Sequence, residues 1–451
     1  MLKTPVDPDV VRRQIARSGL KPVGLATIRE LNILVSAIQA ESGAEFIRME
    51  MGIPGLPPPR QAVEAEIEAL RRHVGSIYPP FDGIPELKRE IARFIMRFMD
   101  VAVDPSGCLP TVGSMQGTYL ALMAVGRRKK GKNRILFIDP GFPVNKRQVK
   151  LIGLPHDGFD LYDYRGERLG PKLESYLQAG DVAAVLYSTP NNPSWICLSA
   201  QELETIGRLC TRYDVIALED QAYFGMDFRH DYSRPGQPPY IPTVARYTDH
   251  AILLMSSSKA FSLAGQRIGM MAVKDALFNS TGDGLAPYFG SSQFGYALIY
   301  GGMYGLSAGV SHSAQWGLAG VLGAVNRGDF DFVDAVREYE RRAAAMKRLF
   351  LENGFHLVYD NDDGAPLADG FYFTVAYPGL TGVELVEELL YYGISAISLK
   401  TTGSSRHEGI RACVSLTPED KFDRLHRRLA RFDEDHRNGW RAAAEGYTQA
   451  G

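Results

Sequence analysis

Five short apolar segments, each followed by residues that can carry chemistry, constrain the fold more than any other feature of this chain. They are residues 109–112, 134–138, 183–188, 215–218 and 251–255. Apolar runs of this length, with helical patterns between them, predict buried strands of a mostly parallel sheet. The parallel strands of a doubly wound sheet end at one edge, where ligands bind. We therefore expect an α/β protein with a three-layer α/β/α large domain and its site at that edge.

A lysine stands just past the last of these segments. The run is Ser256-Ser257-Ser258-Lys259, and Arg267 follows it. A primary amine in a cleft can form a Schiff base with an aldehyde, while the serines and the arginine can hold an anion such as a phosphate. This combination of groups indicates pyridoxal 5'-phosphate (PLP) as the cofactor.

The spacing around this lysine resembles the signature of a known family. Serine three residues before it, arginine eight after it and glycine two further on are similar to the fold-type I PLP-dependent aminotransferases, the class I/II or aspartate aminotransferase-like superfamily. The resemblance implies that Lys259 is the residue that binds PLP covalently. It also implies that Ser256 and Arg267 hold the cofactor phosphate, with Ser258 as a further cofactor contact.

The ends of the first two segments match the same family. Gly113-Ser114-Met115 opens a helix, and a glycine-led helix start aims free backbone N–H groups and the positive end of the helix dipole at one point. The resemblance makes these three residues the phosphate loop. It also implies that Phe142, after the second segment, stacks on the pyridine ring.

The third and fourth segments end in further matches. Asn192 is followed by proline as in the family's Asn-Pro-Thr-Gly. The resemblance implies that Asn192 donates a hydrogen bond to the phenolic oxygen of the cofactor and also contacts the substrate. Trp195 replaces the family's glycine and either narrows the site or packs away from it. Asp220 and Tyr223 match Asp-x-x-Tyr, which implies that Tyr223 bonds the phenolic oxygen. A carboxylate such as Asp220 beside the pyridine nitrogen keeps it protonated, and a protonated ring is the electron sink for carbanion chemistry.

Three more positions carry expectations about substrate and subunits. Arg411 lies mid-strand among apolar neighbours, and it resembles the family arginine that binds the substrate carboxylate in bidentate fashion; Arg406 is the alternative. Gly52, in a proline-rich run, either resembles the family's Gly-x-Pro segment at the substrate or belongs to a plain linker. Tyr78 resembles the residue that reaches the cofactor phosphate of a second subunit, which implies a homodimer with shared active sites. Its alternative reading is a half-buried turn aromatic.

Length and composition complete these expectations. A chain of 451 residues predicts a large PLP-binding domain at 56–328 and a smaller α/β domain at 329–451, joined by an amino-terminal arm at 1–55. A net charge of -2 gives no reason to expect nucleic acid or membrane as a partner. The four cysteines lack metal-ligand or disulfide spacing, and the amino terminus lacks the apolar centre of a secretion signal. We therefore expect no metal and a cytoplasmic protein.

Two unusual stretches need an interpretation. The basic run from Arg127 to Lys132 follows a helix, where cations complement the helix dipole, and it is interpreted as a solvated loop. No Asp, Glu, Lys or Arg occurs from Gly284 to Asn326, but glycines and polar residues interrupt this stretch. It is therefore interpreted as a subunit or domain interface rather than a membrane span.

Together these residues predict a PLP-dependent aminotransferase that acts on an amino acid and a 2-oxo acid. The preferred amino donor is expected to have a neutral, apolar or aromatic side chain, since aspartate-specific relatives use an arginine from the region that here has no cation. A β-lyase or a racemase would use the same cofactor contacts. A PLP-binding regulatory protein is a more distant alternative.

Overall fold

The computed structural model describes residues 4–443. These residues divide into a larger unit, 56–191 with 196–336, and a smaller unit, 4–55 with 192–195 and 337–443. The larger unit extends beyond the expected residue 328, because the ring of Phe332 packs against those of Phe94, Phe98 and Phe224. Residues 192–195 belong to the smaller unit although the chain on both sides belongs to the larger one.

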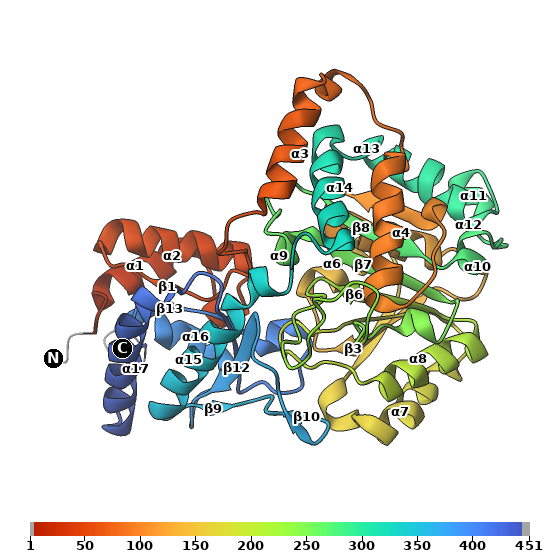
Figure 1. The fold of residues 1–451 in the computed structure, drawn as a ribbon. Coiled ribbons are helices and arrows are strands. Elements are labelled where there is room, and N and C mark those ends of the chain that lie inside the picture. Colours follow the sequence, from red (N-terminus) through yellow and green to blue (C-terminus); the bar gives the residue numbers. More distant parts are fainter. Residues whose placement is uncertain (1–3, 444–451) are drawn as a thin grey trace. The chain divides into compact units, whose positions relative to one another are not determined.

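A seven-stranded sheet forms the centre of the larger unit (Figure 1). Its strand order is β2-β8-β7-β6-β5-β3-β4. All neighbours are parallel except β8, which is antiparallel to both β2 and β7. The strands are β2 Cys108–Thr111, β3 Arg134–Asp139, β4 His156–Asp160, β5 Val182–Ser188, β6 Ile216–Gln221, β7 Ala251–Ser256 and β8 Gly269–Val273.

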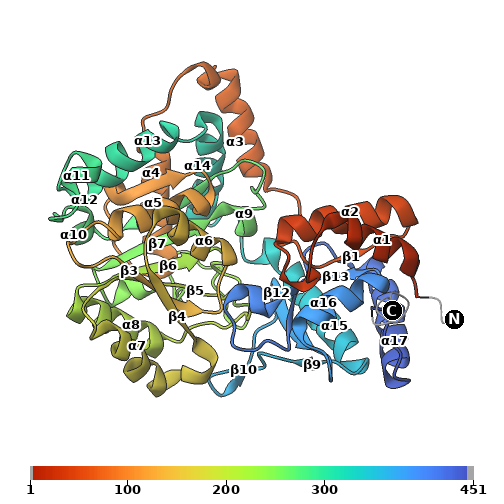
Figure 2. The ribbon, with the colours of Figure 1, turned by 180° about the vertical axis from the view of Figure 1, so that it is seen from behind.

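Helices cover both faces of this sheet. The helix α4 lies in front of the sheet in Figure 1, whereas α5 and α6 lie in front in the view from behind in Figure 2. The helix α5 packs on β7 and β8, and α8 packs on β6. The principal helices are α3 Arg60–Arg71, α4 Pro85–Met99, α5 Gly113–Val125, α6 Pro143–Ile152, α7 Leu169–Leu177, α8 Ala200–Tyr213, α9 Ser257–Ala260, α10 Asp275–Phe278 and α14 His312–Arg327. The resulting α/β/α layers are the predicted fold class.

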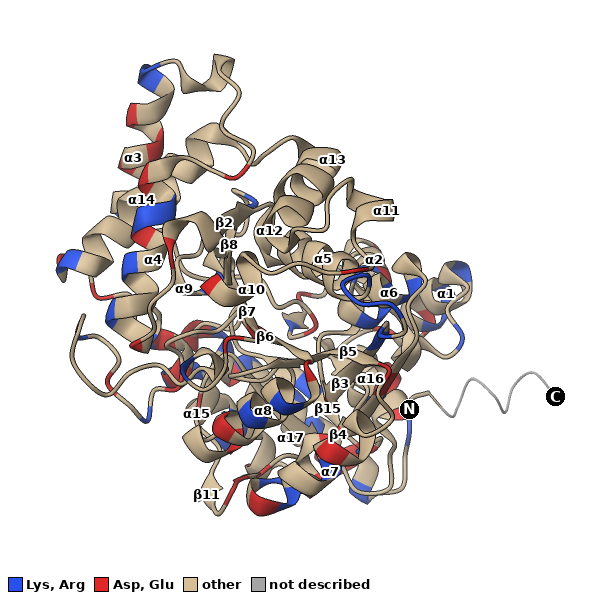
Figure 3. Cartoon of the chain, turned by 90° about the vertical axis from the view of Figure 1, so that its right-hand side faces the viewer, with Lys and Arg blue, Asp and Glu red and all other residues tan. Residues whose placement is uncertain are grey.

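The uncharged stretch ends in α14, and its earlier part forms a chain of short helices. They are α11 Ala286–Phe289, α12 Phe294–Tyr296, a π-helix at Ala297–Met303 and α13 Tyr304–Ser307. Figure 3 shows α11, α12 and α13 without a charged residue. Within residues 4–443, no helix combines the length and the apolar character that crossing a membrane requires. The interface expected for this stretch and the cytoplasmic location stay predictions.

The smaller unit combines helices with short strands. A four-stranded antiparallel sheet has the order β14-β15-β12-β9, and β1 pairs in parallel with β13. The strands are β1 Ile47–Arg48, β9 His356–Leu357, β10 Asn361–Asp362, β11 Ala365–Pro366, β12 Tyr372–Ala376, β13 Ile394–Ser395, β14 Ile397–Ser398 and β15 Ile410–Cys413. The helices are α1 Pro8–Ser18, α2 Ile28–Ser42, α15 Glu338–Glu352, α16 Gly382–Tyr391 and α17 Phe422–Arg437.

Candidate active site

The carboxyl ends of β2, β3, β5, β6 and β7 meet at one edge of the large sheet. Although β2 pairs with the antiparallel β8, it runs in the same direction as β7. The register places Gly269 opposite both Thr111 of β2 and Ser256 of β7. The loops that follow β2 and β7 therefore begin close to each other, and both contain residues predicted to bind phosphate.

The loop after β2 places a glycine turn against an arginine. Gly113 has a φ of +64°, and a Cβ atom on it would lie 2.5 Å from Nη2 of Arg267. A Cβ atom on Gly269 would lie 2.7 Å from the backbone nitrogen of Ser114. Gly269 therefore requires glycine, because any side chain would collide with the backbone at the start of α5. At Gly113 the positive φ favours glycine, and the absence of a side chain lets the guanidinium approach the backbone. The free N–H groups of this 13-residue helix and the guanidinium together suit a phosphate group.

Lys259 lies on the short helix α9, directly after β7. Ser256 caps this helix, since its Oγ accepts a hydrogen bond from the Ser258 N–H at 3.2 Å. Ser257 Oγ donates to the carbonyl oxygen of Ile268 at 2.5 Å and so ties the turn to the chain that enters β8. The half-buried Lys259 is thereby held at the carboxyl edge of the sheet.

Asp220 is a buried carboxylate with few hydrogen bonds to offset its loss of solvation. It lies in β6, opposite Ser188 of β5 and Leu254 of β7. Among residues 4–443, its carboxylate accepts one hydrogen bond, from the Ala222 N–H at 3.1 Å. Burial raises the pKa of Asp220 to about 7. A cation beside it would oppose this shift, and a protonated pyridine nitrogen is such a cation.

The neighbouring Glu219 provides a contrast. It is also buried, and burial raises its pKa to about 6. However, its carboxylate accepts hydrogen bonds from two hydroxyls, one amide and one backbone N–H, those of Tyr187, Thr243, Gln221 and Val244. Glu219 is therefore satisfied by the fold, whereas Asp220 keeps acceptor capacity for a ligand. Together with the glycine–arginine turn, this difference fits PLP.

Four further predicted residues lie on the larger unit. Met115 is half-buried in the first turn of α5, and Phe142 is half-buried directly before α6. Tyr223 is buried in the turn after β6. Tyr78, between α3 and α4, is 89% exposed. Its alternative reading as a half-buried turn aromatic is therefore wrong, because this chain leaves almost the whole side chain in solvent.

Arg411 is a buried guanidinium without a carboxylate partner in the smaller unit. It lies in β15, between Thr374 of β12 and Ile397 of β14, and is 1% exposed. Nη1 donates to Oδ1 of Asn192 at 3.2 Å, and Nη2 donates to the backbone oxygen of Glu50 at 2.6 Å. Nε has no hydrogen-bond partner within residues 4–443, and both acceptors are neutral. A carboxylate ligand would strongly stabilise a buried guanidinium of this kind.

Tyr372 packs on Arg411, a contact that the sequence did not indicate. Its ring lies 4.4 Å from the guanidinium carbon of Arg411. A Cβ atom on Gly52 would lie 2.0 Å from the Tyr372 hydroxyl, so the tyrosine requires glycine there. The contact links strand β12 to a loop more than 300 residues earlier in the chain, and no local pattern encodes it.

Trp195 packs inside the smaller unit. It is 1% exposed, and its ring meets that of Tyr372 edge to face at 6.1 Å between centroids. A Cβ atom on Gly370 would lie 2.1 Å from Cε2 of Trp195, so the indole fills the space that this glycine leaves. Because Tyr372 in turn contacts Arg411, both expectations for Trp195 stay predictions. Arg406 is half-buried in the loop before β15.

Comparisons with known proteins agree with this geometry. A family model described as aminotransferase class I and II matches residues 44–301, more than half of the chain. The LL-diaminopimelate aminotransferase of Natranaerobius thermophilus is 26% identical over 73% of this chain and 78% of that protein. The probable aspartate aminotransferase of Methanocaldococcus jannaschii is 23% identical over 89% of this chain and 96% of that protein. A mutant Thermus thermophilus aspartate aminotransferase has a similar fold, with a TM-score of 0.71 at 18% identity over 91% of this chain and 96% of that chain.

Proposed function

Because this chain belongs to the class I and II aminotransferases and is a PLP-dependent enzyme, we propose that it moves the amino group of a neutral, apolar or aromatic L-amino acid to a 2-oxo acid. The observation that carries this proposal is the buried Arg411, whose guanidinium has only neutral acceptors among the described residues. Amino acids and 2-oxo acids share a carboxylate next to the reacting carbon. One arginine therefore serves both substrates.

Each remaining residue has a role in the proposed reaction. PLP, when bound, supplies an electron sink for the charge that develops at the substrate Cα. Lys259 binds the cofactor and then carries the Cα proton as general base and acid. Asp220 keeps the pyridine nitrogen protonated, while Asn192 and Tyr223 donate hydrogen bonds to the phenolic oxygen. Phe142 stacks on the ring, and Gly113, Ser114, Met115, Ser256, Ser258 and Arg267 hold the phosphate.

The role of Arg411 predicts a selective effect on substrate affinity. In Arg411→Lys we expect the KM for both the amino donor and the 2-oxo acid to rise about tenfold or more, because an ammonium replaces a bidentate fork with a point charge. We expect kcat to change much less. The matched control is Arg406→Lys, which should leave both KM values near those of the wild type. A larger rise in KM for Arg406→Lys than for Arg411→Lys would transfer the role to Arg406.

The preference for neutral donors rests on the absence of Lys and Arg from Gly284 to Asn326. A second substrate carboxylate buried there would have no partner charge, which is costly. We expect kcat/KM for phenylalanine, leucine or methionine to exceed that for aspartate, with one common 2-oxo acid in all assays. Aspartate as the best donor would contradict this preference.

We further propose that the protein is a homodimer with shared active sites. A large exposed apolar surface on one unit is typical of an interaction site. Here Tyr78 lies next to Ile77, which is 57% exposed, and the Ile77 carbonyl lies 3.0 Å from Nδ1 of His312. Phe81 packs on Tyr304 at 4.6 Å between ring centroids, so this loop adjoins the uncharged stretch. That stretch adds further exposed side chains, Tyr288, Tyr296, Tyr300, Tyr304 and Leu306.

The homodimer leads to a prediction for Tyr78. Light scattering at micromolar concentration should give the mass of two chains. Tyr78→Phe should keep this mass but weaken PLP binding about tenfold, because the variant loses only a hydroxyl that bonds an anionic phosphate. Tyr296→Phe removes a hydroxyl from the same surface and should leave PLP binding unchanged. A monomer of full activity would contradict the shared site.

A further inference from the structure

The basic run from Arg127 to Lys132 differs from the solvated loop that the sequence predicts. Arg128 is only 8% exposed, and its Nη2 donates to the backbone oxygen of Asp214 at 3.3 Å and to the Asp214 carboxylate. Lys129 contacts the same carboxylate. Nζ of Lys132 donates to the backbone oxygen of Tyr213 at 2.5 Å. Three cations therefore gather at the carboxyl end of α8, where Asp214 contacts two of them and Asp283 lies near enough to favour the charged forms of Arg128 and Lys129.

The burial and proximity of these cations disfavour their charged forms. Burial lowers the pKa of Arg128. Burial and then the nearby Arg128 lower the pKa of Lys129. Burial, Lys129 and Arg128 together lower the pKa of Lys132. An anion bound nearby would relieve the repulsion, because an opposite charge favours the charged form of each group.

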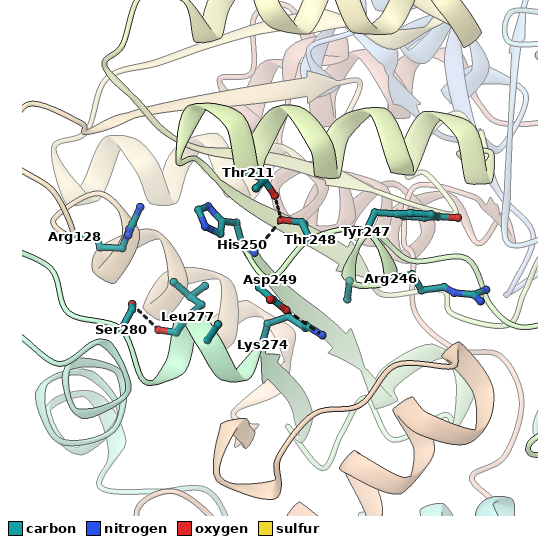
Figure 4. Close-up of a pocket in the computed structure, with 12 residues that line it drawn as sticks. Arg128, Thr211, Arg246, Tyr247, Thr248, Asp249, His250, Lys274, Leu277 and Ser280 are labelled. Carbon is teal, nitrogen blue, oxygen red and sulfur yellow. Dashed lines mark hydrogen bonds and ion pairs between the residues drawn. The ribbon is translucent and has the colours of Figure 1, made fainter.

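Arg128 also lines a cavity of about 500 Å³ in the larger unit (Figure 4). Arg128 and Arg246 lie at opposite ends of the group drawn there, with His250, Asp249 and Lys274 between them. The cavity is lined by Arg128, Thr211, Ala245, Arg246, Tyr247, Thr248, Asp249, His250, Lys274, Ala276, Leu277 and Ser280. The lining thus contains three Lys or Arg side chains, a histidine and one carboxylate, and the Asp214 carboxylate outside the lining contacts Arg128 and lies 3.6 Å from Nδ1 of His250.

Two ion pairs of this lining can exchange for a ligand. Lys274 lies 3.4 Å from Asp249, whose side chain is 62% exposed, and Arg246 lies 2.8 Å from Asp100, which is outside the lining. Pairs as exposed as these contribute little to stability. A phosphate or carboxylate could therefore replace the aspartates at low cost and gain several charge-assisted hydrogen bonds.

Hydroxyl groups add neutral donors to the same wall. Oγ1 of Thr211 and Oγ1 of Thr248 lie 2.6 Å apart. Thr248 Oγ1 also accepts a hydrogen bond from the backbone N–H of His250 at 3.0 Å. Burial, and then Arg128, lower the pKa of His250, so an anion in the cavity would favour its protonated form. Leu277 and the ring of Tyr247 supply apolar surface for an organic group.

The cavity is distinct from the proposed catalytic site. It lies at the amino end of β7, since His250 directly precedes this strand, whereas Lys259 follows the other end. The strand has six residues, and at about 3.3 Å per residue it separates the two ends by roughly 20 Å. The phosphate group of PLP at Gly113 would therefore leave this cavity free.

We propose that this cavity binds a small organic anion that bears a phosphate or carboxylate group and is neither the cofactor nor the amino-acid substrate. A cavity of this volume accepts more than an inorganic ion, since small-molecule sites typically measure a few hundred Å³ or more. Within the lining, three Lys or Arg side chains outnumber one carboxylate, which favours an anionic ligand. The hydroxyls and the apolar wall allow an organic group beside the anion.

The test is calorimetric titration of the PLP-loaded enzyme, in which the catalytic phosphate site is already filled. Pyrophosphate and citrate serve as probes, and their comparison distinguishes a phosphate from a carboxylate ligand. We expect saturable binding of at least one probe with one site per chain. Arg246→Gln combined with Lys274→Gln should weaken it about tenfold or more, which is the loss expected when two charge-assisted contacts disappear.

The matched control is Lys130→Gln, which removes an exposed cation of the same basic run that does not line the cavity. It should leave the affinity unchanged, and transamination by the double variant without probe should equal that of the wild type. The proposal fails if neither probe binds saturably to the loaded enzyme. It also fails if the double variant binds as tightly as the wild type, or if Lys130→Gln weakens binding as much as the double substitution.

Discussion

Replacing Lys259 by alanine is expected to remove transamination and the covalent link to PLP together. The lysine has two roles, as the residue that holds the cofactor and as the base that moves the Cα proton, so the loss in kcat should be at least roughly 10³-fold. The wild-type protein, reduced with borohydride and digested, should give a PLP-labelled peptide that contains Lys259. The variant should give no labelled peptide.

The control for this experiment is Lys130→Ala, which removes an exposed lysine from the larger unit. It should retain both the label and the activity. Label on the peptide of residues 256–267 in Lys259→Ala, or label on a different lysine in the wild type, would contradict the assignment. Added methylamine should restore part of the activity of Lys259→Ala, because a free amine can replace the missing base.

Asp220→Asn is expected to reduce kcat by about 10²-fold or more, equivalent to roughly 3 kcal/mol, while PLP still binds. The amide keeps the size of the side chain but cannot hold the pyridine nitrogen protonated. The phosphate-binding residues are unchanged, so occupancy should stay high. Turnover and the absorbance of bound cofactor, measured on the same sample, separate these two effects. Near-normal turnover at full occupancy would remove Asp220 from this role.

The same substitution should stabilise the cofactor-free protein at alkaline pH. The folded-state pKa of Asp220, about 7, lies above the ordinary value of 3.8. Folding therefore favours protonated Asp220. Its contribution to the free energy of unfolding is complete below about pH 4 and is lost as the pH rises through about 7. The resulting change in the free energy of unfolding between acid and alkaline pH is on the order of 4 kcal/mol. Cofactor-free Asp220→Asn should thus have a higher Tm than the wild type at pH 8 and a similar Tm at pH 4.

The central strands were predictable because the fold buries both of their faces. The strands β3, β5, β6 and β7 therefore each contain a continuous apolar run, and the residues that the family resemblance identified lie in or after their ends. The strand β4 lies at the edge of the sheet, and His156, Asp157 and Gly158 in it are exposed. Its sequence gives no comparable signal.

Among the features that were not predicted, the first helix has a clear local sequence signal, whereas two long-range contacts have none. The amino-terminal arm contains α1, whose start is marked by the capping side chain of Asp7 and by Pro8 in the first turn. The ring of Tyr372 over Arg411 and the packing of Trp195 against Gly370 join segments far apart in the chain. Only the tertiary fold brings these residues together, so propensity and spacing could not indicate them.

The most direct test of transamination is a single half-reaction. PLP-loaded enzyme is mixed with phenylalanine, leucine or methionine without any 2-oxo acid, and the products are counted per active site. We expect one equivalent of the matching 2-oxo acid, conversion of the cofactor to pyridoxamine phosphate and no free ammonia. Continuous release of ammonia, or racemised amino acid with no 2-oxo acid, would contradict an aminotransferase.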